Sequence, residues 1–300
     1  MDTFILLGDM GSGDEAQYVV SESINEKIKE LGRKDIFVCG LGDNIYEDGC
    51  YSLNDKQFIT KFEKPYEKIS DDVKFFMCLG NHDYGYNVGL KDNSQHQVDY
   101  GILSQKNNKK WVMPSKYYTF KKKNIHFFVM DTNFDFMSDT EITKQFNYFV
   151  KEINKSTKPW KILTGHHTLR SVGGHGNANA PESGEAGVVM EKFFQELFSK
   201  CEIDLYICGH DHNKQVIETT IGTGKESERR NTTLIVCGTG GQKYHDFTNF
   251  NNVSQGELQF TSSNLGYGLC ECTEKRLTVQ FYDEGNNPEY THTLLINHNV

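Results

Sequence analysis

Short apolar runs recur along the chain, and five of them end in glycine followed closely by a residue able to bind a metal ion. Apolar runs of this length between turn residues are typical of buried strands. The five segments are 4–9, 37–43, 75–82, 162–166 and 205–212. Because open α/β sheets bind ligands outside the carboxyl ends of their strands, we expect the polar residues after these runs to form one shared site.

Helical patterns fill several of the intervals between these strands. Residues 14–31 predict a helix capped by Asp14, with apolar residues at helical spacing on one face. Further helices are predicted at 55–66, 140–153 and 188–199. The polar segment 84–116 predicts loops that lie over the site, and a glycine-rich loop at 172–187 contains His175.

The second half of the chain is rich in strand patterns. Residues 117–120 and 125–130 predict a hairpin, and later runs predict more strands. These later strands are 215–221, 232–237, 268–272, 277–281 and 290–296. We therefore predict an α/β protein of one domain, residues 1–300, in which a second sheet from the second half closes over a first half of alternating strands and helices.

Composition narrows the class of partner. The chain has 300 residues, 37% of them hydrophobic, which is typical of a soluble globular protein. Its net charge of −9 disfavours nucleic acid or an anionic membrane as the main partner. Because no apolar run reaches the length of about 18 residues that a transmembrane helix requires, we expect no membrane span.

The compartment stays open. The first strand is expected from residue 3, which leaves no room for a signal peptide, so the protein is intracellular or a signal has been removed. The eight cysteines include no CxxC pair, and several end buried apolar runs, so we expect reduced thiols as in cytosolic proteins. Glycosylation-type motifs at Asn154, Asn231 and Asn252 favour a secreted protein instead, but such motifs arise easily by chance in an asparagine-rich chain.

The polar residues after the strands divide into two sets by ligand type. Asp9, Tyr46 and His212 form an oxygen-rich set, Asn81, His166 and His210 form an uncharged set, and Asp43 is shared. Hard anionic oxygens suit a trivalent ion, and imidazole with an amide oxygen suits a divalent one. A tyrosine with an ordinary pKa near 10 must bind a metal to ionise at working pH. Two metals about 3.5–4 Å apart can hold both the attacking and the leaving oxygen of a displacement at phosphorus, which predicts phosphoester hydrolysis.

These motifs resemble those of a known family. Gly8-Asp9-Met10-Gly11, Gly42-Asp43-Asn44-Ile45-Tyr46, Gly80-Asn81-His82-Asp83, Gly165-His166 and Gly209-His210-Asp211-His212 stand in this order. Together they resemble the five-block signature of the purple acid phosphatases, with the closest likeness to the small, mammalian-type tartrate-resistant acid phosphatases. The resemblance covers about residues 3–282.

The resemblance implies a four-layer α-β-β-α sandwich of two mixed sheets flanked by helices, with a dinuclear metal site at the carboxyl ends of the strands. It implies Fe(III) on Asp9, Asp43, Tyr46 and His212, and a divalent Fe, Zn or Mn on Asp43, Asn81, His166 and His210. His82 and His175 match histidines that contact phosphate and protonate the leaving group.

The implied function is an acid phosphatase that hydrolyses phosphate monoesters by attack of a metal-bound hydroxide. The substrate would be a small phosphoester or a phosphoprotein, and we expect a monomer. The family is usually secreted or lysosomal, which contrasts with the missing signal peptide.

The chain also departs from the family pattern. The acidic, protease-sensitive loop that represses the mammalian enzymes has no counterpart in the short segment 131–143, which predicts activity without proteolytic processing. His167 stands where a tyrosine is commoner, and its role is open between orienting a neighbour and facing the substrate.

Two alternatives remain. Another dimetal phosphoesterase, such as a phosphodiesterase or protein phosphatase, would usually carry a histidine two residues after Asp9, where this chain has Gly11. A non-catalytic scaffold on the same fold is the second alternative. Several other polar residues are predicted to be structural: Asp83, Asp131 and Asp211 as local hydrogen-bond partners, and His96, His126, His245, His292 and His298 as residues without partners at ligand spacing.

Overall fold

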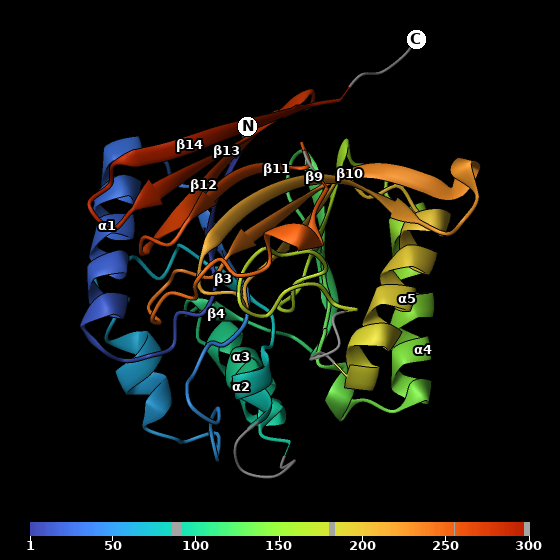
Figure 1. Cartoon of the computed structure of the whole chain (residues 1–300). Helices are drawn as coiled ribbons and strands as arrows, with labels where there is room; N and C mark the ends of the chain where they lie inside the picture. Colours follow the sequence, from blue (N-terminus) through green and yellow to red (C-terminus); the bar gives the residue numbers. More distant parts are fainter. Residues whose placement is uncertain (86–91, 180–183, 255, 297–300) are drawn as a thin grey trace.

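The computed structural model describes residues 1–85, 92–179, 184–254 and 256–296. Two mixed β-sheets of seven strands each form the centre of the molecule (Figure 1). Helix α1 (Glu15–Leu31) lies on one side of the sheets, and helices α4 (Asp139–Asn154) and α5 (Gly184–Lys200) lie on the other. The predicted α/β sandwich of four layers is confirmed.

The first sheet combines strands from both ends of the chain. Its order is β14-β13-β12-β1-β2-β3-β4. The strands are β1 (Asp2–Leu7), β2 (Phe37–Gly40), β3 (Phe75–Met77), β4 (Trp111–Val112), β12 (Gly266–Cys272), β13 (Arg276–Asp283) and β14 (Pro288–Leu295). Strands β1 to β4 are parallel, whereas β12 pairs antiparallel with β1 and thereby covers an edge that would otherwise be unpaired. The prediction that the second-half strands all join a second sheet is therefore wrong for the last three.

The second sheet begins in the middle of the chain. Its order is β11-β9-β10-β8-β7-β6-β5. The strands are β5 (Tyr118–Lys121), β6 (Ile125–Val129), β7 (Trp160–Thr164), β8 (Leu205–Cys208), β9 (Lys214–Gly222), β10 (Arg229–Cys237) and β11 (Leu258–Ser262). The sequence did not predict β11. Aromatic side chains from both sheets fill the space between them: Phe4 stacks on Phe37 at 5.4 Å between ring centroids, and Phe127 meets both edge-on.

The helices agree with the sequence only in part. Asp14 caps α1, accepting a hydrogen bond from the backbone N–H of Ala16, as predicted. The predicted helix at 55–66 is shorter in the structure: helical residues run from 57 to 63 and include the π-helical turn η1 (Ile59–Glu63). The chain also forms short helical turns: α2 (Asn81–Tyr84), η3 (Phe134–Phe136), η5 (Glu226–Glu228) and η6 (Phe250–Asn252). In the described part of the chain, no helix combines the length and the apolar character needed to cross a membrane.

The segment predicted as loops over the site contains a helix of 13 residues, α3 (Ser94–Lys106). That prediction is wrong because the buried face of α3 carries polar residues such as Gln97 and Ser104, so the sequence lacks apolar helical spacing. Residues 86–91 of the same segment lie outside the described residues. Helix α5 also begins four residues earlier than predicted, at Gly184 rather than at residue 188.

All eight cysteines are buried and unpaired, as expected for structural thiols. Each lies in the described part of the chain, so no disulfide contributes to the stability of this fold.

His126 on β6 predicts a specific loss of stability in acid. The side chain is 1% exposed, and neither ring nitrogen has a hydrogen-bond partner among the described residues. Burial, together with Lys121 and Lys158, lowers the pKa of His126 to about 4. The unfolded chain therefore binds a proton near pH 6.5 that the folded protein does not bind until near pH 4, and the free energy of unfolding falls as the pH drops through this window.

We expect His126→Leu to remove this dependence, because leucine fills the site without a titrating group. Between pH 7 and pH 4.5 the free energy of unfolding of the variant should fall by about 2 kcal/mol less than that of the wild type. Urea unfolding of both proteins at the two pH values measures the difference. Equal losses in the two proteins would show that His126 does not limit acid stability.

Candidate metal centre

The site forms where the carboxyl ends of both sheets meet. Asp9, Asp43 and Asn81 follow β1, β2 and β3 of the first sheet, whereas His166, His210 and His212 follow β7 and β8 of the second. Three of these residues adopt positive φ angles: Asp9 at 55°, Asp43 at 51° and His210 at 70°. Such backbone conformations are uncommon for residues other than glycine and gather at functional sites.

Tyr46, Asp9 and His212 bring three donor atoms together. The Tyr46 hydroxyl oxygen lies 3.1 Å from Asp9 Oδ1 and 3.1 Å from His212 Nε2, and the last two atoms are 3.5 Å apart. His212 Nδ1 lies 2.7 Å from the carbonyl oxygen of Lys243, so it carries the proton and donates it. The lone pair of Nε2 is thereby aimed at the other two donors, as in metal sites where an outer partner fixes the histidine tautomer.

A second group of donors surrounds His166. Its Nε2 atom lies 3.1 Å from Asn81 Oδ1, 3.1 Å from His210 Nδ1 and 3.4 Å from Asp43 Oδ2. His166 Nδ1 lies 2.8 Å from the carbonyl oxygen of Leu41 and donates to it, which again leaves Nε2 free to bind an ion.

These distances fit metal ligation. Ligands that share one ion at bond lengths of about 2.0–2.2 Å lie roughly 3.0–3.6 Å from one another. The separations in both groups, 3.1–3.5 Å, are within this range. Asp9, Asp43 and His166 also offer atoms that all lie within 4.8 Å of one another, so the two groups are adjacent and Asp43 lies where it could serve both.

Backbone groups hold the two carboxylates in place. The backbone N–H of His82 donates to Asp43 Oδ1 at 3.0 Å, and that of His210 donates to Asp9 Oδ2 at 2.9 Å. Glycine allows these close approaches, because a β-carbon at Gly80 would overlap the Asp43 carboxylate. Gly11 is similarly constrained by the backbone of the 43–46 turn, so a histidine side chain does not fit there and Tyr46 completes the group instead.

The electrostatics of the site favour bound positive charge. Burial and the carboxylates of Asp43 and Asp9 raise the pKa of Tyr46 far above its ordinary value, so a phenolate forms here only beside a cation. Burial opposes protonation of His166, but Asp43 outweighs it and raises the pKa of His166 to about 9. Burial and the surrounding histidines lower the pKa of His210 well below its ordinary value, which keeps this imidazole in the neutral form that binds metals.

His82 and His175 lie on the two flanks of the uncharged group. His82 Nε2 is 4.0 Å from Asp43 Oδ2, and His82 Nδ1 lies 2.6 Å from the backbone oxygen of Glu47. The His175 ring stacks on His210 at 3.9 Å between centroids, at the exposed side of the site. Burial lowers the pKa of His175.

A cavity of about 510 Å³ opens beside these residues. It is lined by Asn81, His82, Thr132, Phe134, Asp135, His167, Thr168, Gly174, His175, Asn177, Ala178, Ala186, Gly187, Met190 and His210. His167 therefore faces the cavity, and its Nδ1 lies 2.8 Å from the hydroxyl of Thr132. A larger hollow of about 810 Å³ near Trp160 and Glu218 contains none of the predicted ligands.

The neighbouring aspartates make local hydrogen bonds, as predicted. Asp83 accepts from the backbone N–H groups of Asn44, Ile45 and Gly80. Asp131 accepts from the Tyr84 hydroxyl at 2.6 Å. His292 lies 3.4 Å from Glu218, away from the predicted ligands, and His298 lies outside the described residues.

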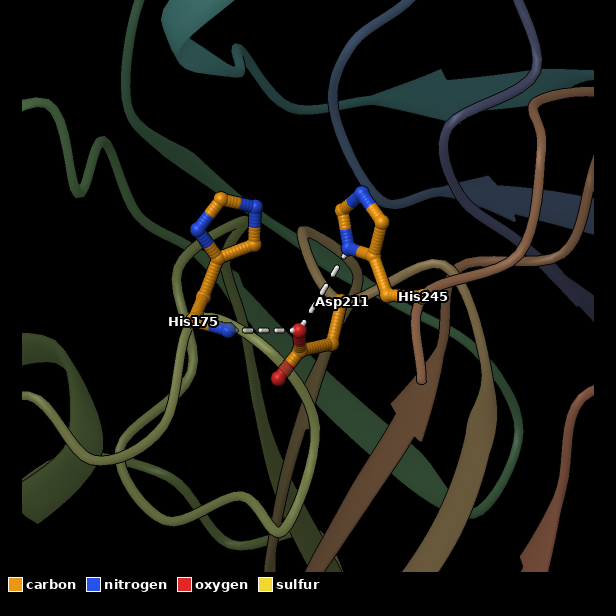
Figure 2. A group of neighbouring side chains, drawn as sticks. All are labelled: His175, Asp211 and His245. Atoms are coloured by element: carbon orange, nitrogen blue, oxygen red, sulfur yellow. Dashed lines mark hydrogen bonds and ion pairs between the residues drawn. The ribbon is translucent and has the colours of Figure 1, made fainter. Parts of the chain in front are cut away.

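The prediction that His245 has no partners at ligand spacing is wrong. Its ring stacks on His212 with centroids 3.8 Å apart. Its Nδ1 lies 3.5 Å from Asp211 Oδ1, a contact that Figure 2 shows. The loop after β10 reaches the site because the backbone N–H of His245 donates to the carbonyl oxygen of His212. Sequence spacing gave no sign of this long-range contact. Only the position of His245 shortly after a strand, β10, and the glycines Gly240 and Gly241 that follow it could have suggested the contact.

The sandwich and its two adjacent donor groups define the class of dimetal phosphoesterases. The chain belongs to the calcineurin-like phosphoesterase family, whose sequence model matches residues 3–214.

Similar proteins include several acid phosphatases. Purple acid phosphatase 3 of Arabidopsis thaliana is 27% identical over 94% of this chain and 74% of its own length. Tartrate-resistant acid phosphatase type 5 of Homo sapiens is 25% identical over 93% of this chain and 86% of its own length.

Two solved structures share the fold. GAP50, described as the anchor in the inner membrane complex of Plasmodium, has a TM-score of 0.74 at 23% identity and covers 99% of this chain and 89% of its own. Purple acid phosphatase PPD1 from yellow lupin has a TM-score of 0.70 at 16% identity and covers 99% of this chain and 54% of its own.

Proposed function

We propose that this protein is an acid phosphatase that hydrolyses phosphate monoesters at a dinuclear metal centre. The observation that carries this proposal is the pair of donor groups on either side of Asp43, each with the spacing of metal ligands. The likeness to purple and tartrate-resistant acid phosphatases supports it. We propose a small phosphoester or a phosphoprotein as substrate and a monomer as the active form.

The two donor groups differ in charge, and we propose that they hold different metals. Asp9, Asp43, Tyr46 and His212 would hold Fe(III), and Asp43, Asn81, His166 and His210 would hold a divalent Fe, Zn or Mn. When bound, such ions polarise phosphate oxygens and lower the pKa of attacking water.

We propose that His82 acts on the leaving group. Hydrolysis breaks the bond between phosphorus and the leaving oxygen, forms one from water oxygen to phosphorus, and requires a proton on the departing alcohol. The bond of His82 Nδ1 to the Glu47 carbonyl turns its Nε2 towards the centre, 4.0 Å from Asp43. When both of its ring nitrogens carry protons, His82 can give the proton on Nε2 to the leaving oxygen. His175, stacked over His210, would contact the phosphate from the cavity side.

We expect His82→Ala to lower kcat on an alkyl phosphate by about a hundredfold, the usual contribution of a general acid. The loss should be much smaller with nitrophenyl phosphate, because nitrophenolate leaves without a proton. Steady-state kinetics on both substrates, with metal analysis and His96→Ala as the control, measure the effect. Equal losses on the two substrates would contradict a proton-donating role.

A non-catalytic scaffold is the second candidate, and the likeness of the fold to the Plasmodium anchor protein favours considering it. A scaffold has no need for two convergent donor groups. Release of inorganic phosphate from phosphate monoesters by the metal-loaded protein, absent after treatment with a chelator, tests the proposed function against the scaffold. A protein that binds no metal and releases no phosphate would be a scaffold.

A further inference from the structure

An outer pair of histidines covers the two ligand histidines that follow β8. The His175 ring stacks on His210 at 3.9 Å between centroids with 24° between planes, and the His245 ring stacks on His212 at 3.8 Å with 19°. The outer rings lie side by side, 4.9 Å apart. Asp211, which lies between the two ligand histidines in the sequence, reaches towards both outer residues (Figure 2).

Asp211 is held firmly in this position. It is fully buried, and its Oδ1 accepts the backbone N–H of His175 at 2.9 Å. Its Oδ2 accepts from the Ser171 hydroxyl, and Ser171 Oγ in turn lies 2.7 Å from Gln215 Nε2 and 2.9 Å from the backbone nitrogen of Gly173. Networks of this kind orient the ligands of metal sites. Because the hydrogen bonds to Asp211 are already formed, its carboxylate needs no further ordering when an ion binds.

We propose that His175, Asp211 and His245 form a third cation site, which binds zinc next to the dinuclear centre. Each residue offers one donor atom, and these atoms lie within 4.8 Å of one another. Two imidazoles and one carboxylate are a donor set that zinc prefers, with a fourth position left for water. None of the three belongs to the seven donors assigned to the dinuclear centre.

The surroundings of His245 Nδ1 favour an ion. This nitrogen accepts the backbone N–H of His212 at 3.3 Å and faces Asp211 Oδ1 at 3.5 Å. A cation placed between this nitrogen and the carboxylate oxygen can bind to both atoms. The side chain of His245 is 29% exposed and His175 lies at the surface, so an ion can enter from solvent.

This site has a consequence that rests on the proposed function. Zinc bound to His175 removes that ring from the phosphate, so excess zinc should inhibit hydrolysis. Asp211, His175 and His245 lie beside the dinuclear centre and are not among its proposed ligands. Inhibition by zinc bound to these three residues can therefore be distinguished from loss of the catalytic metals.

The test counts zinc retained per chain after the metal-loaded protein is equilibrated with excess zinc and desalted. Wild type and His96→Asn should retain one more zinc than His245→Asn and His175→Asn. The difference of one ion assigns the site whether or not the dinuclear centre is catalytic, and loss of phosphatase activity alone leaves the count unaffected. Inhibition by excess zinc should also be weaker in His245→Asn. It is measured as the ratio of phosphatase activity with added zinc to activity without it.

Thermal unfolding of each variant verifies that it is folded. Should His245→Asn fail to fold, the exposed His175→Asn carries the test. Equal zinc counts in wild type and in the folded variants would overturn the proposal. An unchanged count together with a raised KM in His245→Asn would also overturn it, and would assign His245 to substrate binding instead.

Discussion

Asp43→Ala should retain less than about one thousandth of the wild-type phosphatase activity, a loss of more than 4 kcal/mol in transition-state stabilisation. Asp43 is 1% exposed and lies between the two donor groups, so its loss should affect both of the proposed metals at once. It also leaves the backbone N–H of His82 without its acceptor and the ring of His166 without the carboxylate at 3.4 Å. We expect the variant to bind less than half of the wild-type metal.

Metal analysis and phosphate release measured on the same preparation test this expectation. Asp135→Ala is the matched control, because Asp135 lines the cavity but belongs to neither donor group. We expect the control to retain its metals and most of its activity. Full metal content in Asp43→Ala would show that the two donor groups do not depend on a shared carboxylate.

Asp83→Ala should have the largest effect on stability among the residues outside the donor groups. The Asp83 carboxylate is fully buried and accepts from the backbone N–H groups of Asn44, Ile45 and Gly80 and from Gln97 Nε2 at 2.6 Å. Alanine leaves these donors without an acceptor, which costs about 3–4 kcal/mol of unfolding free energy even if water satisfies some of them.

Asp83 also joins the turn after β2 to the start of α2, and the two segments carry Asp43 and Asn81. We therefore expect weaker metal binding as well as lower stability in Asp83→Ala. Burial and the nearby Asp43 carboxylate raise the pKa of Asp83 to about 6, so removal of its charge offsets part of the loss. Asp83→Asn, which keeps one acceptor oxygen, should lie between wild type and alanine in urea unfolding; wild-type stability in Asp83→Ala would contradict this role.

The apolar runs that end in glycine and a polar residue predicted which polar residues gather at one edge of the sheets, because this pattern is local. A buried parallel strand needs a continuous apolar run, and the residue after it emerges at the carboxyl edge of the sheet. Asp9, Asp43 and His166 each follow a strand in this way, and the structure brings their donor atoms within 4.8 Å. Their roles as ligands remain a prediction.

Features that depend on distant contacts could not be predicted in the same way. The pairing of β12 with β1 joins residues such as Leu6 and Gly268, and nothing in either segment specifies which sheet β12 enters. Helix α3 buries polar residues that hide its periodicity. His245 reaches the site through a loop whose position depends on a backbone hydrogen bond to His212. Contacts of this kind are set by tertiary packing rather than by local sequence.

The measurement that tests the central claim most directly is the visible absorption spectrum of the purified, metal-analysed protein beside that of Tyr46→Phe. Tyr46 lies 3.1 Å from both Asp9 Oδ1 and His212 Nε2, and burial among carboxylates keeps its hydroxyl protonated unless a cation binds. Our account predicts about two metals per chain, one of them iron. It also predicts a strong visible band from phenolate to Fe(III) that disappears in the variant. A colourless protein with two metals would contradict the iron assignment, and a protein that holds no metal would contradict the dinuclear centre itself.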